Sequence, residues 1–449
     1  MKKYFLLPLM ALFALNAVAQ DFDTEPVVKF DNESENLKFT IGARMMADVA
    51  YYHSDFTPLK SGAALTDARI RTSMTYQNWY FFADFDFSKG KFKQKNIFLQ
   101  YAWDQNKDQS NWKWHAIKAG YYNDPASMSR NTSIGSYHFI SRPGMVNALQ
   151  NGRQLGVSYK YVDKNVFLHQ GIYAENLYND QIAGFQGATI SGRWLYLPIN
   201  TETNTLHIGV GARYAKLKTG TVNSNVVQTN LNLSTSLETY VDPDAQFVNA
   251  NVPWASDVFN VNVEALYRGK KFFVRGEYTY KAIGKERDDE TLFKNQLGTL
   301  WSWGSLESWQ AGNPLKTSHF QGAYVEAGFL VFGQPYTYNR KEALLGGLGG
   351  KSLEIVARYS WTDLNDVVDG AYYFVAQDKY IDNGILADYP VASTSIGGGE
   401  LHSVTLGVNY AINRFVQVMV NYSYHNLNRD KYAYDKNFHG VQGRLVFSF

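Results

Sequence analysis

The feature that most constrains this chain is an alternation of apolar and polar residues that runs through short segments. In RFVQVMVNYSY, residues 414–424, valines and tyrosines occupy one set of alternate positions, and Gln, Met, Asn and Ser occupy the other. KSLEIVARYSW, residues 351–361, places Glu354 and Arg358 opposite an apolar face that ends in Trp361. Because successive side chains of a strand point to opposite faces, each segment predicts a β-strand with one apolar face.

The same test predicts about sixteen strands, each roughly as long as a tilted strand must be to cross a bilayer. They are expected near residues 37–52, 65–77, 79–87, 94–104, 113–121, 152–162, 165–175, 187–196, 206–216, 258–268, 271–281, 319–332, 351–362, 402–411, 414–425 and 440–449. Their apolar faces repeatedly end in Tyr or Trp, which is typical of the interfacial girdle of a membrane barrel. An even number of strands lets the first and last strands pair, which closes the barrel and removes its edges.

The predicted connections alternate between short and long. Tight turns are expected at 77–78, 163–165, 269–270 and 412–413, and long loops at 122–151, 217–257, 282–318, 363–401 and 426–439. Outer-membrane barrels sort their connections in this way, with short periplasmic turns and long extracellular loops. The segments 105–112 and 333–350 fit less well, because each is long for a periplasmic turn.

Composition agrees with this fold class. Aromatic residues make up 16% of the chain, yet the mean hydropathy is −0.33, as expected when each strand shows one face to lipid and one to water. No apolar run after the N-terminus is long enough for a transmembrane helix. A secreted β-sandwich or solenoid shares this composition but has no reason to sort its loops by length. We therefore predict an all-β, transmembrane antiparallel barrel over residues 36–449.

The first residues are typical of a secretory signal peptide. Lys2 and Lys3 precede an apolar stretch at residues 4–15, and residues 17–19 form a small-residue cleavage site. We expect residues 1–19 to be removed and residues 20–35 to form a short periplasmic leader. Loss of the two lysines leaves equal numbers of basic and acidic residues, so nucleic-acid binding driven by global charge is not expected.

No motif predicts catalysis, a metal site or a cofactor. The nine histidines never occur as HxxxH or HExxH, and the chain has no cysteine, so the usual zinc spacings are absent. GGLGGKS, residues 346–352, resembles a phosphate-binding P-loop, but Leu345 stands where the first glycine is required. A flexible turn before a strand explains this stretch, and we predict that the chain is not an enzyme.

Arginines on the polar faces predict a charged channel wall. An Arg or Lys that faces lipid at the bilayer midplane costs about 2–4 kcal/mol, so these side chains should face a lumen. The predicted wall contains Arg44, Arg69, Arg71, Arg213, Arg275 and Arg358, with acids such as Asp84 among them. About sixteen strands leave an aqueous channel, and charged groups that line water provide an ion pathway. The alternative for any one arginine is to pair with a neighbouring acid.

The long loop at residues 122–151 carries Arg130 and Arg142 and a single acid, Asp124. We predict that this loop folds inward, which would narrow the pore and let its arginines set the field there. The alternative is a loop that lies outside the barrel and packs on other loops.

Several segments taken together resemble the phosphate-selective porin O and P family of Gram-negative outer membranes. They are IGARMMAD (41–48), DARIRTSMTYQNWYFFADFDFS (67–88), NGRQLGVSY (151–159), RGKKFFVRGEYTYK (268–281), FQGAYVEAGFLVFGQPYTY (320–338), KSLEIVARYSWTDLND (351–366), GGELHSVTLGVNY (398–410) and the closing GRLVFSF. The resemblance implies a trimeric porin whose third loop constricts the pore and whose phosphate-selective members carry an arginine ladder. Arg44, Arg69, Arg71 and Asp84 lie in the matching segments. Ile70 separates the family's arginine pair here, but alternation keeps Arg69 and Arg71 on one wall.

We therefore predict a passive porin of the outer membrane of a Gram-negative bacterium, embedded in the lipid bilayer as a homotrimer. Its solutes would be small and hydrophilic, with a preference for anions such as phosphate. One alternative is a sugar channel in which Trp301, Trp303 and Trp309 stack on sugar rings, and another is a surface adhesin that forms no channel. The resemblance also implies that Phe449, which ends the last strand, is presented to the barrel assembly machinery.

Overall fold

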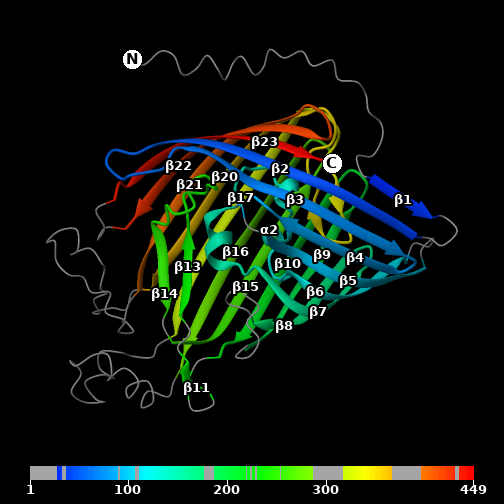
Figure 1. The fold of residues 1–449 in the computed structure, drawn as a ribbon, viewed down its shortest axis with the longest axis horizontal. Coiled ribbons are helices and arrows are strands. Elements are labelled where there is room, and N and C mark those ends of the chain that lie inside the picture. Colours follow the sequence, from blue (N-terminus) through cyan, green and yellow to red (C-terminus); the bar gives the residue numbers. More distant parts are fainter. Residues whose placement is uncertain are drawn as a thin grey trace.

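The computed structural model is a closed barrel of sixteen antiparallel strands, which confirms the predicted fold class (Figure 1). The structure describes residues 28–32, 37–88, 90, 92–106, 111–175, 187–218, 220–222, 225–227, 230–252, 254–286, 317–366, 396–429 and 434–449. The barrel strands are β2 (Leu37–His53), β3 (Gly62–Tyr76), β4 (Trp79–Asp86), β5 (Lys93–Gln105), β6 (Lys113–Asn123), β7 (Arg153–Val162), β8 (Val166–Glu175), β9 (Gly187–Asn200), β10 (Thr205–Lys216), β15 (Ala255–Arg268), β16 (Phe272–Lys285), β17 (Ser318–Phe332), β20 (Ser352–Asp366), β21 (Ile396–Ala411), β22 (Val416–Asn428) and β23 (Asn437–Ser448).

The barrel closes where its first and last strands meet. Each strand pairs with the next along the chain, and β2 pairs with β23 in a register that aligns Arg44 with Ser448. Phe449 extends this ladder, because its N–H donates to the Ala43 carbonyl at 2.9 Å and its carbonyl accepts from the Ala43 N–H at 3.0 Å. The C-terminal residue is therefore part of the seam that closes the barrel.

A further strand, β1 (Val28–Asn32), lies beside the start of β2. Val28 pairs with Ile41, and Asn32 pairs with Leu37. Because β3 occupies the other edge of β2 at these residues, β1 takes the edge that β23 uses further along. β1 thus continues the seam beyond Phe449. It falls within the predicted leader, whereas residues 1–27, with the predicted signal peptide, lie outside the described residues.

The connections sort by length between the two ends of the barrel. At the end that holds Phe449, the turn end, five connections contain two to four residues each: 77–78, 163–165, 201–204, 269–271 and 412–415. At the opposite end, the loop end, the connections are longer and include the hairpins β11 (Gly220–Val222) with β12 (Asn225–Val227) and β13 (Leu231–Thr235) with β14 (Val248–Val252). Two segments of the turn end, 106–112 and 333–351, are long, as the sequence indicates.

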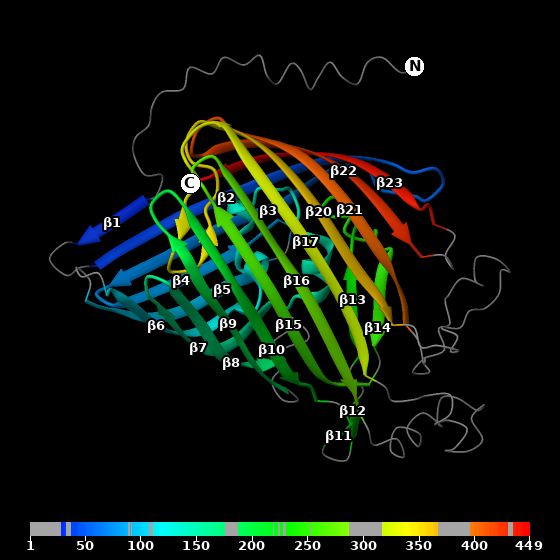
Figure 2. The ribbon, with the colours of Figure 1, turned by 180° about the vertical axis from the view of Figure 1, so that it is seen from behind.

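The two faces of the barrel wall differ in polarity. On β23, Val441, Leu445 and Phe447 are exposed on the outer surface, whereas the alternating Gln442 and Arg444 are buried inside. The same alternation runs through the strands β10, β15, β16, β17 and β20, which lie side by side in Figure 2. The outer surface can therefore face lipid. Among the described residues, no helix is long and apolar enough to cross a membrane.

Part of the interior is filled by an apolar core built from loops. The helix α3 (Gly144–Leu149) packs against β13, β16, β17 and β20, and β14 packs against β21. Met145, Val146 and Leu149 of α3 are fully buried. This core occupies the side of the lumen bounded by β10 and by the strands from β15 to β23.

Candidate functional site

The segment between β6 and β7, residues 124–152, lies inside the barrel and is called the insert loop (Figure 1). It contains α2 (Met128–Asn131), the short helix η2 (Ile134–Ser136) and α3. Glu277 on β16 accepts the backbone N–H groups of Met128 at 2.7 Å and Ser129 at 2.9 Å. The first N–H groups of a helix have no partner within the helix. Glu277 therefore satisfies two of them and attaches the start of the insert loop to the wall.

The middle of the insert loop is attached to β20 and β21. His138 Nδ1 lies 2.8 Å from Glu354 Oε1 on β20, and Asn409 on β21 donates to the His138 carbonyl at 2.7 Å. Asn409 also donates to Glu354 Oε2 at 2.6 Å. These side chains are buried. The insert loop is thus held at both α2 and His138 against one side of the barrel.

Two of the predicted pore arginines form buried ion pairs instead of facing water. Arg213 Nε lies 3.1 Å from Asp124 Oδ2, and Arg213 also pairs with Glu175. Arg275 Nε lies 2.7 Å from Glu326 Oε2. Arg213 and Arg275 are 2% and 1% exposed. Because these cations are paired with carboxylates and buried away from water, neither arginine is available to a solute.

Arg358 and Arg142 both stabilise the insert loop, Arg358 from the wall and Arg142 from within the loop. Arg358 Nη2 lies 2.6 Å from Glu238 Oε2, and its Nη1 donates to the Ser141 carbonyl at 2.7 Å. Burial alone would raise the pKa of Glu238, but the Arg358 guanidinium holds that pKa below its ordinary value. Arg142 donates to the Ser129 carbonyl at 3.1 Å and is buried. Both arginines position the loop.

The opposite side of the lumen carries excess positive charge. The group called the basic wall consists of Arg44 on β2, Arg69 and Arg71 on β3, and Lys93 and Lys95 on β5, together with Asp67, Asp84 and Asp86. Asp67 accepts from Arg44 Nε at 2.8 Å and lies 2.7 Å from Arg69 Nε. Asp84 lies 2.9 Å from Arg69 Nη1. Among the described residues, Arg71 forms no ion pair or hydrogen bond, although Asp84 is its cross-strand neighbour.

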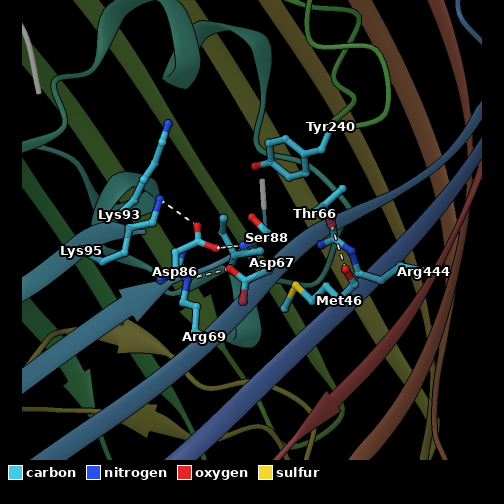
Figure 3. Close-up of a pocket in the computed structure, with 11 residues that line it drawn as sticks. Met46, Thr66, Asp67, Arg69, Asp86, Ser88, Lys93, Lys95, Tyr240 and Arg444 are labelled. Carbon is cyan, nitrogen blue, oxygen red and sulfur yellow. Dashed lines mark hydrogen bonds and ion pairs between the residues drawn. The ribbon is translucent and has the colours of Figure 1, made fainter. Parts of the chain in front are cut away.

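A cavity of about 220 Å³ lies over the loop end of this wall (Figure 3). Lys93 and Lys95 line it from β5, and Tyr240 lies across from them. Asp86 pairs with Lys95 Nζ at 3.0 Å and accepts the Ser88 N–H at 3.0 Å. Lys93 has no ion pair within the described part of the chain. The cavity is therefore a water-accessible recess in which the positive charges outnumber the negative ones.

Arg130 brings a further cation to this region from the insert loop. Its guanidinium forms no ion pair with any residue that the structure describes. Burial, together with repulsion from Arg142, lowers the pKa of Arg130 to about 10. Arg130 therefore remains protonated at neutral pH.

Arg153, at the start of β7, lies between the insert loop and the basic wall. It donates to Asn96 Oδ1 on β5 at 2.6 Å and interacts electrostatically with Arg69 and Arg130. Asn96 is neutral, so this hydrogen bond does not neutralise Arg153, and Asp84 interacts with Arg153 electrostatically without forming an ion pair. Acids interact with Arg71, Arg130 and Arg153 electrostatically, but none of these three cations forms an ion pair with a carboxylate among the described residues.

The long connection at the turn end, residues 333–351, also enters the lumen and is called the turn insert. It forms a small hairpin of β18 (Tyr338–Asn339) and β19 (Leu344–Leu345). Lys160 Nζ on β7 lies 2.7 Å from Glu342 Oε2, and Arg193 on β9 donates to the Ala343 carbonyl at 2.9 Å. The Gly346 carbonyl lies 3.1 Å from His138 Nε2. The P-loop-like stretch is therefore a contact between the two inserts.

The predicted pore residues thus fall into two groups. Arg44, Arg69, Arg71 and Asp84 come together in the basic wall, where Arg44 is itself buried against Asp67, and Arg130 lies on the insert loop. Arg142, Arg213, Arg275 and Arg358 have buried partners elsewhere. Lys93, Lys95 and Arg153 are absent from the prediction. The lysines alternate at the start of β5 and so share one face, which is a signal that the sequence contains.

Two other predictions concern the tryptophans of the sugar-channel alternative and the absence of a metal site. Trp301, Trp303 and Trp309, on which the sugar-channel alternative depends, lie outside the described residues. In the described ranges, no group of three or more His, Asp and Glu residues could hold a metal ion.

A closed barrel with an apolar outer face, an inserted loop and a charged lumen defines a porin, a channel of the outer membrane. Solved structures share this fold. An anion-selective porin from Comamonas acidovorans is 11% identical, with a TM-score of 0.51 over 92% of this chain and 100% of that one. OprB from Pseudomonas putida is 9% identical, with a TM-score of 0.52 over 92% of this chain and 94% of that one.

The chain belongs to the phosphate-selective porin O and P family, whose family model matches residues 39–449. This match confirms the resemblance inferred from the sequence segments. No curated protein sequence matches the chain.

Proposed function

We propose that this porin prefers small anions and that inorganic phosphate is among its solutes. One observation supports the proposal above the others. The three aspartates of the basic wall, Asp67, Asp84 and Asp86, each form an ion pair with a basic side chain. Three arginines form no ion pair with a carboxylate among the described residues: Arg71, Arg130 and Arg153. An anion that enters this region therefore meets cations that are not held in ion pairs with carboxylates.

The arrangement suits passage as well as binding. A conducting site must attract an ion strongly enough to replace part of its hydration shell and weakly enough to release it to the next site. The free cations lie on separate elements, with Arg71 on β3, Arg130 on α2 and Arg153 on β7. A solute can pass from one guanidinium to the next without a single deep binding site. The low-dielectric walls of a narrow lumen strengthen this field.

Reversal potentials of the full-length protein in planar bilayers, measured across a potassium chloride gradient, test the anion preference. The wild type should give an anion-selective potential. Arg71→Gln and Arg130→Gln should each shift this potential toward zero, because each removes from the lumen a positive charge that is not held in an ion pair. Arg414→Gln is the matched control, since Arg414 lies exposed in the 412–415 turn. A cation-selective wild type would refute the proposal.

The preference for phosphate is tested by a separate measurement on the same channels. Inorganic phosphate added to a chloride solution should reduce the chloride current of the wild type, and Arg71→Gln should raise the concentration needed. A chloride current that is unaffected by phosphate would remove phosphate from the solutes and leave a general anion channel.

We also propose that the mature chain begins at Gln20, assembles as a homotrimer and is presented to the barrel assembly machinery through Phe449. The pairing of Phe449 with Ala43 in the closing seam supports the last of these roles. Intact mass of the protein from outer membranes tests the cleavage site. Chemical cross-linking before denaturation tests the trimer, which should appear as a band of three chains.

A further inference from the structure

Four aromatic side chains lie next to the basic wall on the inner face of the barrel. This aromatic patch consists of Tyr80 and Phe82 on β4, Phe98 on β5 and Tyr122 on β6. The ring centroids of Phe82 and Phe98 are 5.5 Å apart with an interplanar angle of 30°, and Tyr80 lies 6.3 Å from Phe82. Phe98 and Tyr122 are 6.0 Å apart. The rings therefore form one continuous surface across three strands.

The register places this patch inside the barrel. Asp84 and Asp86 face the lumen, so Phe82 and Tyr80, which precede Asp84 by two and four residues, share that face. Phe82 pairs across the ladder with Ser73 on β3 and with Phe98 on β5.

Tyr122 is buried, but the two phenylalanines of the patch do not belong to the packed interior. Phe82 and Phe98 are half-buried, and neither ring is part of the buried apolar clusters that the described residues form. A channel wall that faces water is normally polar. Partly exposed phenylalanine rings on such a wall leave apolar surface in contact with water, and the ring of a solute can cover that surface.

Cations lie on both sides of the patch along the channel axis. Arg71 precedes Ser73 by two residues, so its row lies about 7 Å from the Phe82 row toward the loop end. On the other side, Lys118 Nζ lies 4.4 Å from the Phe98 ring centroid and 5.1 Å from that of Tyr122. Lys118 has no ion pair within the described residues. An aromatic surface between two positive charges is complementary to a ring that carries an anionic group.

We propose that the aromatic patch is a subsite for the ring of an organic anion whose phosphate or carboxylate is held by Arg71, next to Arg69 on the same face of β3. The shared chemistry is a ring with an apolar face joined to an anion, as in aryl phosphates and sugar phosphates. The proposal rests on the anion channel proposed above and extends it from inorganic phosphate to ring-bearing anions. An uncharged sugar would gain only the ring contact, because it has no group for the arginines.

Block of the chloride current by added solutes tests this subsite in the full-length protein. Phenyl phosphate, glucose 6-phosphate, inorganic phosphate and glucose are compared in planar bilayers. A ring contact with aromatic side chains strengthens binding by a factor of about two to ten. Phenyl phosphate, glucose 6-phosphate or both should therefore block at a concentration lower by this factor than inorganic phosphate, and glucose should not block. The two ring compounds distinguish an aryl ring from a sugar ring.

Phe82→Leu and Phe98→Leu locate the effect. Each should raise the blocking concentration of the ring-bearing anions toward that of inorganic phosphate and leave block by inorganic phosphate unchanged. Phe81→Leu is the matched control, because Phe81 is exposed on the outer face of the same strand. Equal block of the wild type by all three phosphates would overturn the subsite while the anion channel stands. A cation-selective wild type would instead overturn the channel proposal itself. The wild-type comparison also remains decisive if a variant fails to insert.

Discussion

Replacing Glu277 by Gln tests whether one wall carboxylate holds the insert loop in place. Glu277 Oε1 accepts from the Met128 N–H at 2.7 Å and from Asn262 Nδ2 at 2.8 Å. Its Oε2 accepts from the Ser129 N–H at 2.9 Å and from the Tyr324 hydroxyl at 2.7 Å. All four donors converge on a residue that is 3% exposed.

The cost of Glu277→Gln follows from these contacts. If the amide nitrogen takes the place of Oε2, the Tyr324 hydroxyl can rotate and accept from it. The Ser129 N–H cannot, so it is left buried without an acceptor. An unsatisfied buried donor costs about 1–3 kcal/mol. The population of the displaced loop should rise about 5- to 150-fold, because 1.4 kcal/mol corresponds to a factor of ten. The opposite amide orientation, with the nitrogen in the place of Oε1, costs more, because the nitrogen then faces two donors, the Met128 N–H and the Asn262 side-chain amide.

Open-channel noise and hydrogen exchange measure this change. Glu277→Gln should increase current fluctuations in planar bilayers and speed the exchange of the Met128 and Ser129 amides. Glu400→Gln is the matched control, because Glu400 is a partly exposed acid on β21 that contacts no part of the insert loop. Wild-type noise together with slow exchange at Ser129 in Glu277→Gln would refute the view that Glu277 anchors the loop.

Three further outcomes are expected. Because the pKa of Arg130 is lowered to about 10, its charge is lost as the pH rises through that value. The anion preference should therefore hold from pH 6 to 8 and fall by pH 10.5. A fall below pH 8 would show that the anion preference depends on another group. Glu326→Ala strands the buried Arg275 and should cost about 3–5 kcal/mol, seen as unfolding of the barrel on gels at a lower temperature than for the wild type. Deletion of Phe449 should reduce the amount of assembled barrel while the inserted channels keep wild-type conductance; full assembly would show that the residue is dispensable.

Much of the fold could be predicted because the period of a strand is two residues. That period assigns a face to each side chain, so Arg44, Arg213 and Arg275 could all be placed on the inner wall from the sequence. Arg275 pairs with Glu326, its cross-strand neighbour, but the partners of Arg213 and Arg358 could not be predicted in the same way. Arg213 meets Asp124 across 89 residues, and Arg358 meets Glu238 across 120. Such contacts depend on where loops fold, and alternation contains no information about loops.

The aromatic patch and the turn insert were not predicted, for different reasons. The aromatic patch could be predicted from the sequence, because Tyr80 and Phe82 alternate with the inward-facing Asp84. It was not predicted because apolar residues are not expected on a channel wall that faces water. The turn insert is different. Its length is visible in the sequence, yet nothing local indicates that Glu342 meets Lys160 or that Gly346 meets His138. Both contacts join segments that are distant along the chain.

The seam between β2 and β23 also has a consequence for biogenesis. Asp48 and Arg444, which pair across it at 2.6 Å, are 396 residues apart. Until β23 is in place, β2 and the most recently added strand each present an open sheet edge, and such edges pair readily with other chains. A truncated chain therefore keeps two adhesive edges, however many strands it has formed. Only a chain that includes β23 is free of them, so this strand determines both when the barrel closes and when it stops being prone to aggregation.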